Sequence, residues 1–438
     1  MKQATLLAGA MALLINLSAQ SKITAIKAGR LIDTEKGIVL TNQVILIDSN
    51  MITDVGPGLS IPKNATVIDL SNSTVMPGLI DCHTHLTEQP SGDYYQDIFR
   101  RTPMDRAVLA PTFAKRTLEA GFTTVRDVGA PAFVDVALKN AINNGSIDGP
   151  RMLVATLFIG STGSHGDLNG FSPFLDFEWP KNMSGVANGV DELRKQVRYN
   201  IKYGADLIKF GASAGVLSEE ESVGAPQFTQ EEMNAIVAEA KVWGRKTCAH
   251  AHGTDAIKMA VKAGVVSVEH GSFLDDEAIQ LMKQHNTYLV ADIYNDDYII
   301  SEYAKLGYPK KIIDKERLVG QKQRESFAAA VKAGVKIAFG SDAGVYPHGD
   351  NGKQFFYMVK FGLTPVQAIQ AATISAADLL GWKDKVGSIT KGKYADIVAV
   401  DGNLENNIRL MEKVSFVMKD GKLYKNPRPS GEALKQKK

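Results

Sequence analysis

Short apolar stretches alternate with longer helix-forming stretches over most of this chain, and this alternation limits the possible folds more than any other feature. The predicted strands cover residues 75–83, 123–126, 152–156, 207–210, 246–250, 267–270, 287–291 and 336–340. The predicted helices cover residues 104–120, 131–143, 190–203, 229–243, 254–263, 275–284, 311–333 and 355–380. Eight such units predict an α/β fold, a (β/α)8 TIM barrel, although this periodicity is also compatible with an open doubly wound sheet.

The two ends of the chain contain short β-runs separated by turn residues. Neither end has enough strands for a sheet of its own, whereas together they would form one small β-sandwich. We therefore predict a β-sandwich domain built from residues 21–74 and 387–430, with the barrel, residues 75–386, inserted between its halves. The expected strands cover residues 25–32, 43–47, 51–55, 65–70, 396–400, 414–419 and 422–424.

The first twenty residues have the plan of a secretory signal. A positive start, Met1-Lys2, precedes an apolar segment that ends at Leu17. Small residues suited to cleavage near Ala19 or Gln20 follow it. The apolar segment is short for a membrane span, although a retained anchor or a buried first strand would have a similar pattern. We therefore expect a signal peptide at residues 1–20, an exported (periplasmic or secreted) protein, and no membrane span in the mature chain.

The composition excludes several classes of partner. Of the 438 residues, 44% are apolar and 22% are charged, as in ordinary soluble globular proteins. The formal net charge of +2 gives no reason to expect nucleic acid or an anionic membrane as a partner, so we expect a small-molecule substrate. We also expect a homo-oligomer. The two cysteines, Cys82 and Cys248, are predicted to be buried, reduced thiols, because a chain of this size needs no disulfide framework.

Polar side chains occur at the carboxyl ends of several predicted strands. His83 and His85 point the same way, because side chains alternate along a strand. In a barrel these ends converge on one face, where barrel enzymes place their chemistry. Taken singly, each residue has another explanation: a buried His bonded to a carbonyl, a Lys whose amine reaches out of the core, or an Asp in a turn. As a set they predict a metal site, and the set is His83, His85, Lys209, His250, His270 and Asp342.

The residue types indicate which ions would bind. Four imidazoles and a carboxylate suit Zn²⁺ or a similar first-row ion, and the oxygens are too few for Ca²⁺. Two adjacent ions need a bridging anion, and Lys209 could supply it, because its amine can take up CO₂ and become a carbamate. We therefore predict two divalent metal ions, Zn²⁺ by preference, and a CO₂-derived carbamate on Lys209.

Five motifs follow one another along the chain: His83-Thr-His85, Ala205-Asp-Leu-Ile-Lys-Phe-Gly-Ala-Ser-Ala-Gly215, Ala249-His-Ala-His252, Glu269-His-Gly271 and Gly340-Ser-Asp-Ala-Gly344. Taken in this order, they resemble those of the amidohydrolase superfamily of binuclear-metal barrels. The closest resemblance is to its prolidase-like (Xaa-Pro dipeptidase) and imidazolonepropionase-related branch, which includes ochratoxin-cleaving amidases. The resemblance covers nearly the whole chain after the signal and implies a hydrolase that cleaves an amide bond of a dipeptide or an N-acyl amino acid.

The resemblance also implies a role for each member of the predicted metal site. Asp342 and the two histidines of the first motif would hold the more buried ion, and His250 and His270 the more exposed one. Carbamylated Lys209 would bridge the two ions together with a hydroxide that attacks the substrate carbonyl. Asp342 would accept the hydroxide's proton and give it to the leaving amine, so it is the expected general base and acid.

Three further residues are candidates for contact with the substrate. His165 lies in the Gly/Ser-rich loop 160–166, and in similar enzymes a His in such a loop faces the scissile group or the substrate carboxylate. His252 is in phase with His250 along the strand and replaces the Tyr or other polar group expected in many prolidase-like members. Tyr294 is a weaker candidate for binding the substrate carboxylate.

Other polar residues are predicted to be structural. Arg126 and Asp127 are expected to form an ion pair, and no role is assigned to His285 at a helix end or to His348 in an exposed loop. Two enzyme classes stay open. The first is a hydrolase of a dipeptide or an N-acyl amino acid. The second uses the same metal ligands to hydrolyse a cyclic amide, lactone or phosphotriester, or to deaminate its substrate. A non-enzymatic binding protein is the third alternative, but it would have no use for a general base such as Asp342.

Overall fold

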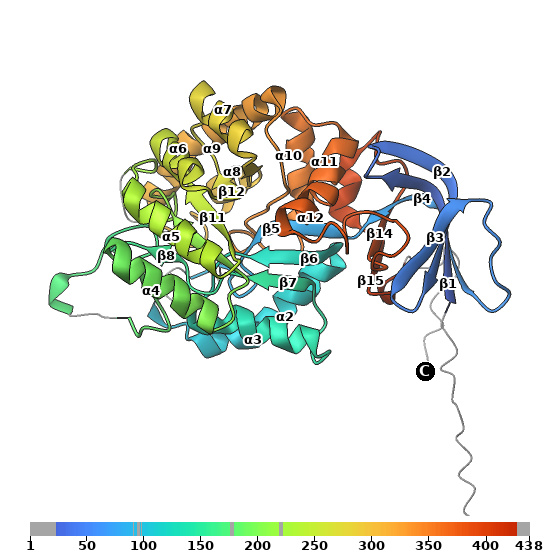
Figure 1. The fold of residues 1–438 in the computed structure, drawn as a ribbon, viewed down its shortest axis with the longest axis horizontal. Coiled ribbons are helices and arrows are strands. Elements are labelled where there is room, and N and C mark those ends of the chain that lie inside the picture. Colours follow the sequence, from blue (N-terminus) through green and yellow to red (C-terminus); the bar gives the residue numbers. More distant parts are fainter. Residues whose placement is uncertain are drawn as a thin grey trace, which may run out of the picture.

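The computed structural model describes residues 23–90, 92–93, 97, 99–175, 179–218 and 222–426. Figure 1 shows a sheet built from both ends of the chain beside a larger body of strands surrounded by helices. The predicted signal peptide, residues 1–20, and the last part of the predicted β-sandwich, residues 427–430, lie outside the described residues. Within the described residues, no helix combines the length and the apolar character needed to cross a membrane.

The strands of the two ends form one seven-stranded sheet in the order β16-β15-β14-β4-β1-β2-β3. β4 joins the two ends, because it pairs in parallel with β1 and antiparallel with β14. Both ends contribute to one apolar cluster, which includes Ile26, Ile45, Ile397 and Phe416. The predicted association of the two ends is therefore confirmed. The strands are β1 (Ile23–Asp33), β2 (Ile38–Asp48), β3 (Met51–Pro57), β4 (Thr66–Pro77), β14 (Ile397–Asp401), β15 (Phe416–Lys419) and β16 (Lys422–Lys425).

The middle region is a closed barrel of parallel strands, which excludes the open sheet. One group of strands has the order β5-β6-β7 and the other the order β13-β12-β11-β10-β8-β9. Asp206 N–H donates to the Val154 carbonyl at 2.8 Å and links the two groups on one side. The segment 336–343 links them on the other side, because it is bonded to both Leu289 and Cys82 (2.9 Å each). The strands are β5 (Leu79–Thr84), β6 (Phe122–Asp127), β7 (Arg151–Val154), β8 (Ile159–Gly160), β9 (Gly185–Val186), β10 (Leu207–Gly211), β11 (Lys246–Ala251), β12 (Ser267–His270) and β13 (Tyr288–Val290).

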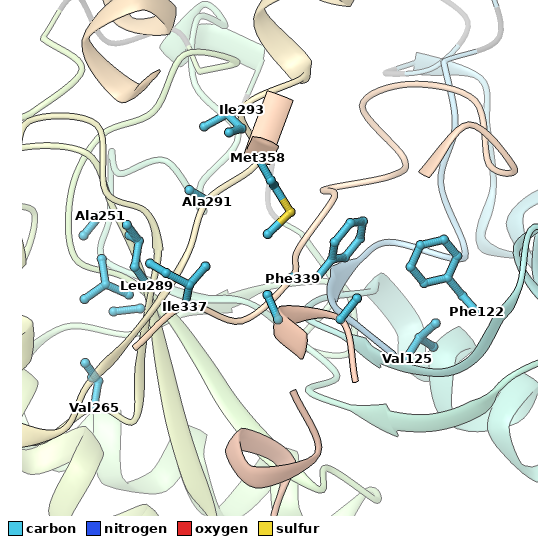
Figure 2. Close-up of a cluster of buried hydrophobic side chains, with 14 of the residues drawn as sticks. Phe122, Val125, Ala251, Val265, Leu289, Ala291, Ile293, Ile337, Phe339 and Met358 are labelled. Carbon is cyan, nitrogen blue, oxygen red and sulfur yellow. The ribbon is translucent and has the colours of Figure 1, made fainter. Parts of the chain in front are cut away.

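Two predicted barrel strands are less regular than expected. The third predicted strand, 152–156, is interrupted at Thr156, whose φ of 63° lies in the left-handed region. The chain then pairs with β10 at Ile159, in the separate strand β8. The eighth one, predicted at 336–340, is a segment held by a single β-bridge to Leu289 and by separate backbone hydrogen bonds. Figure 2 shows the apolar core here, with Leu289 beside Ile337 and with Phe339 facing Phe122.

Helices surround the barrel, and most begin and end near the predicted positions. The predicted helix 355–380 is wrong: three short helices occupy this range, because Pro365 starts a new helix and Thr373 leaves the helical conformation. α8 lies between the predicted strand 287–291 and the predicted helix 311–333, where no helix was predicted. The helices are α2 (Pro103–Glu119), α3 (Val134–Asn143), α4 (Gly189–Lys202), α5 (Gln230–Val242), α6 (Thr254–Ala263), α7 (Asp276–His285), α8 (Asn295–Glu302), α9 (Lys310–Ala333), α10 (Gln354–Lys360), α11 (Pro365–Ala371) and α12 (Ile374–Leu380).

The terminal sheet passes directly into the barrel at Gly78, the only residue between β4 and β5. A β-carbon at this position would lie 2.2 Å from Thr123 Oγ1 of β6, so only glycine fits without a shift of the neighbouring strand. The N–H of Gly78 donates to the Asp396 carbonyl at 2.8 Å, which ties this junction to the far end of the chain.

Candidate metal centre

The end of β5 brings two imidazoles to one carboxylate. His83 Nε2 lies 3.3 Å and His85 Nε2 lies 3.4 Å from Asp342 Oδ1. Asp342 is held in place because its N–H donates to the His83 carbonyl at 2.8 Å, and it adopts a left-handed φ of 54°. These three side chains offer ligand atoms within 4.8 Å of one another, so together they could hold a metal ion.

A second group of imidazoles comes from β11 and β12. His250, His252 and His270 also offer ligand atoms within 4.8 Å of one another. His250 Nε2 is buried and has no hydrogen-bond partner among the described residues, as expected of a nitrogen that would bind a metal. The His270 ring is centred 5.0 Å from the His83 ring, so the two groups are neighbours. The residues present therefore fit two adjacent metal ions.

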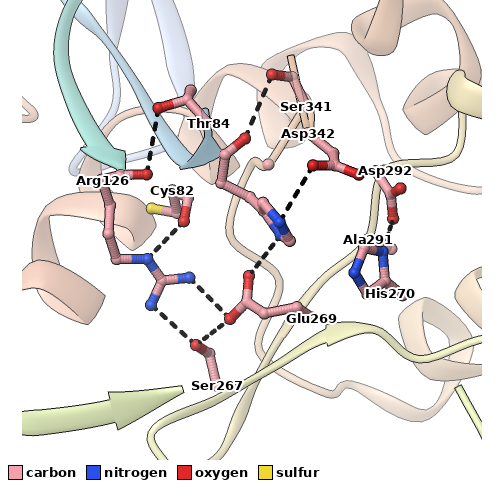
Figure 3. A network of polar contacts seen from close by, with 12 residues as sticks. Cys82, Thr84, Arg126, Ser267, Glu269, His270, Ala291, Asp292, Ser341 and Asp342 are labelled. Carbon is pink, nitrogen blue, oxygen red and sulfur yellow. Dashed lines mark hydrogen bonds and ion pairs between the residues drawn. The ribbon is translucent and has the colours of Figure 1, made fainter. Parts of the chain in front are cut away.

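Contacts of the other ring nitrogens orient three of these imidazoles: a close carboxylate for His83, and hydrogen bonds for His85 and His270. His83 Nδ1 lies 3.0 Å from Glu269 Oε2, and His270 Nδ1 lies 2.8 Å from Asp292 Oδ1 (Figure 3). His85 Nδ1 donates to the Gly129 carbonyl at 3.0 Å. Because the Nδ1 atoms of His85 and His270 carry the donated proton, their Nε2 atoms keep a lone pair for a metal. A carboxylate beside Nδ1 makes the imidazole a stronger ligand.

The Glu269 carboxylate is in turn held by Arg126. The guanidinium donates to Glu269 Oε1 at 2.8 Å, to Ser267 Oγ at 3.0 Å and to the Cys82 carbonyl. The predicted ion pair between Arg126 and Asp127 is therefore wrong. Successive residues of β6 point to opposite faces, and Asp127 Oδ2 instead accepts the Leu86 N–H at 2.6 Å.

Lys209 on β10 is buried beside these groups, with only 1% of its surface exposed. No hydrogen bond or ion pair joins it to any residue that the structure describes. The amine lies 6.0 Å from the centre of the Phe158 ring and lines the same cavity as the histidines. An unpaired ammonium in such a place is costly, so this lysine is suited to conversion to an anionic derivative.

The electrostatics also favour a cation in this place. Burial, followed by the charge of Lys209, holds the pKa of His83 well below its usual range, so this imidazole is neutral and can donate its lone pair. Burial, followed by the negative charge of Asp292, raises the pKa of Asp342 to about 8. A bound cation would stabilise the carboxylate form of Asp342, which is the form that binds metals.

All six predicted ligands line one cavity of about 500 Å³, together with His165 and His252. The His165 ring stacks on His250 with 4.2 Å between ring centres, and burial lowers the pKa of His165 to about 3. His252 Nδ1 lies 2.7 Å from Ser272 Oγ, and its ring stacks on His270 at 4.7 Å. Both residues therefore lie beside candidate metal ligands on the wall of the same cavity.

Two other positions differ from the sequence-based expectation. Tyr294 is not among the residues that line the cavity; its ring packs against Tyr346 at 4.9 Å between centres, because it lies at the start of α8. His348 is not exposed but 3% accessible, and its Nε2 donates to the Glu88 carbonyl at 2.8 Å. Cys82 and Cys248 are buried free thiols, as predicted.

Three residues of the site were missed by the sequence analysis. Asp292 follows β13 and binds His270, and Asn295 Nδ2 donates both to Asp292 (2.7 Å) and to Asp342 (3.2 Å). Gln323 of α9 donates to Asp292 at 2.6 Å. The position of Asp292 after a predicted strand was a usable signal, whereas nothing in the sequence distinguishes Gln323 from the other polar residues of its helix.

The comparisons with known proteins agree with this geometry. The chain matches the amidohydrolase family over residues 74–424. It is 32% identical to the ochratoxinase of Aspergillus niger, over 95% of this chain and 89% of that protein. It is 23% identical to an imidazolonepropionase of Fusobacterium nucleatum, over 83% of this chain and 86% of that protein.

A solved structure shows the same fold. A Xaa-Pro dipeptidase with methionine bound in its active site superposes with a TM-score of 0.88 and 42% identity, covering 92% of this chain and all of that chain. The family match, the level of identity and the closed barrel with its converging histidines all lead to one conclusion. The chain belongs to the amidohydrolase family and is a hydrolase that acts on amide bonds.

Proposed function

We propose that this protein is a binuclear metal-dependent amidohydrolase that cleaves the amide bond of a dipeptide or an N-acyl amino acid. The observation that carries the proposal is the adjacency of two potential ligand groups, with the partnerless Lys209 lining the same cavity. His83, His85 and Asp342 would hold one ion, and His250 and His270 the other. A carbamate on Lys209 would bridge them, and Zn²⁺ is the metal that best suits these ligands.

Two bound divalent ions would supply positive charge that polarises a carbonyl and makes a water nucleophilic at neutral pH. The protein supplies the remaining steps. Asp342 accepts the proton of the attacking water and passes it to the leaving amine, and Asn295 holds its second oxygen at 3.2 Å. His165 and His252, on the cavity wall, bind the substrate beside the scissile bond.

The choice of substrate class rests on the comparisons and on the walls of the cavity. A similar enzyme is a Xaa-Pro dipeptidase with methionine in its active site, and another is an ochratoxinase. The cavity beside the histidines is lined by large apolar side chains, which favour an apolar amino acid or acyl group. These are Leu157, Phe158, Trp179, Met183, Leu217 and Tyr303.

The test is an activity panel combined with metal analysis. The purified protein should contain about two divalent ions per chain and release free amino acid from dipeptides or N-acyl amino acids. Cyclic amides, lactones, phosphotriesters and deaminase substrates belong in the same panel, and turnover of these alone would assign the other enzyme class. His250→Asn should lose both metal and activity, whereas His285→Asn, at the end of α7, should lose neither. An active protein with only trace metal would refute the proposal.

Export and self-association are further proposals. Mass spectrometry of the protein from its native host should find a chain that starts near residue 20, outside the cytoplasm. Light scattering of the purified protein should find more than one chain per particle.

A further inference from the structure

One buried acidic residue of the cavity has no part in the proposed chemistry. Glu316 of α9 is only 3% exposed and lines the cavity that contains the candidate metal ligands. It makes no hydrogen bond and no ion pair with any other described residue, in contrast to Glu269 and Asp292. Buried carboxyls are rarely left without a partner, so this one requires an explanation.

The surroundings of Glu316 make its isolation costly. It lies among the apolar side chains of α8 and α9 that line the same cavity, including Ile299, Tyr303 and Val319. Burial, followed by the negative charges of Asp296 and Asp292, raises the pKa of Glu316 to about 8.

The guanidinium of Arg324 compensates this carboxyl group only in part. Arg324 lies on the same helix, but it is already bonded to Asp296 and to Asp297, each at 2.8 Å. Arg324 therefore offsets the charge of Glu316 only in part, and the pKa of Glu316 stays raised to about 8.

We propose that Glu316 is a specificity-determining residue that binds a positively charged group of the substrate, an ammonium or guanidinium, when the substrate occupies the cavity. This inference rests on the proposed amide hydrolysis and narrows its substrate class. A cation would form a charge-assisted hydrogen bond with the carboxylate and remove the cost of its burial. A neutral or anionic substrate group would leave that cost in place.

Two parts of a substrate could supply the cation. One is the α-ammonium group of a free amino acid or dipeptide, which an N-acyl substrate lacks. The other is the side chain of a lysine or arginine, whose aliphatic stem matches the apolar side chains around Glu316. Both present the same chemistry to the carboxylate, so the experiment must separate them.

The experiment compares wild type with Glu316→Gln, which keeps the size of the side chain and removes its charge. Isothermal titration of the metal-loaded protein uses L-lysine, L-norleucine and hexanoic acid as probes, none of which contains an amide bond that the enzyme could cleave. Lysine against norleucine tests the side-chain cation, and norleucine against hexanoic acid tests the α-ammonium group. Glu325→Gln is the matched control, because Glu325 is exposed on the same helix and pairs with Lys322.

Wild type should bind the cationic member of at least one pair about 10- to 100-fold more tightly. Glu316→Gln should lose that preference and keep its affinity for hexanoic acid. The same change should appear in kcat/KM for the corresponding amide substrates. Equal preferences in wild type and Glu316→Gln, or no preference in wild type, would overturn the inference. Failure of the wild-type protein to hydrolyse any amide would contradict the proposed function, while the binding comparison would still decide the role of Glu316.

Discussion

Replacing Arg126 by methionine would leave the Glu269 carboxylate buried without its cation. Both side chains are almost fully buried, at 2% and 0% exposure, and their closest atoms are 2.8 Å apart. Removing one partner of such a pair typically costs about 3–5 kcal/mol, because the remaining charge loses its compensation. The bonds from Arg126 to Ser267 and to the Cys82 carbonyl are lost as well, so we expect a value near the middle of this range or above it.

Arg126→Met should therefore lower the free energy of unfolding by about 4 kcal/mol, which corresponds to a fall in Tm of roughly 8 °C at about 2 °C per kcal/mol. Glu269→Gln should lower the free energy of unfolding by less than Arg126→Met does, because the amide oxygen of the glutamine still accepts one hydrogen bond. The double variant Arg126→Met/Glu269→Gln should cost at least about 1 kcal/mol less than the two single changes together, since no charge is left buried.

Thermal unfolding with excess Zn²⁺ and with a chelator would separate the stability of the barrel from metal binding. Arg317→Met is the control, because Arg317 forms an exposed pair with Asp314 at 3.1 Å and should change stability by less than about 1 kcal/mol. The reasoning is refuted if Arg126→Met melts within about 1 °C of wild type, or if the two single costs add fully in the double variant.

Three other outcomes are expected. Asp342→Asn should fold and lose at least about 10²-fold in kcat with a smaller change in KM, as measured by steady-state kinetics; normal turnover would remove it as the proton carrier. Lys209→Ala should be nearly inactive and recover in part when a short carboxylic acid is added; full activity without the acid would exclude a bridging carbamate. Burial raises the pKa of Asp135 from 3.8 to about 7, so the folded protein favours the protonated carboxyl group. The contribution of this group to the free energy of unfolding is therefore full below about pH 4 and is lost as the pH rises through about 7. Asp135→Asn cannot titrate but keeps an acceptor for the Thr156 N–H. The Tm of this variant, measured from pH 4 to 8, should therefore depend less on pH than the Tm of wild type. An unchanged pH profile would contradict this assignment.

The sequence predicted the elements whose side chains repeat with a regular period. The barrel strands, the long helix α9 and the union of the two ends follow from such patterns, as do the positions of His83 and Asp342 at strand ends. Contacts between distant segments could not be predicted in this way. Arg126 and Glu269 are 143 residues apart, and the local pattern suggested Asp127 as the partner instead.

The features of the site that were not predicted also depend on contacts between distant segments. α8 is only eight residues long, and its first turn contains two aspartates, so no apolar period marks it as a helix. Glu316 belongs to a predicted helix that is rich in charged residues, and its burial depends on how α8 and the cavity are arranged around it. Such a residue can be found only when the packing of the helices is known.

The direct passage of β4 into β5 bears on the order in which the protein can assemble during synthesis. β14 is made near the end of translation, yet it pairs with β4 up to Pro77, immediately before the strand that carries His83. One support of the first barrel strand, the pairing of β4 with β14, is therefore absent until almost the whole chain has left the ribosome. A shortened chain that ends after α12 would retain every candidate ligand and the pairing of β5 with β6, but it would lack this support, so we expect it to bind metal more weakly than the full chain.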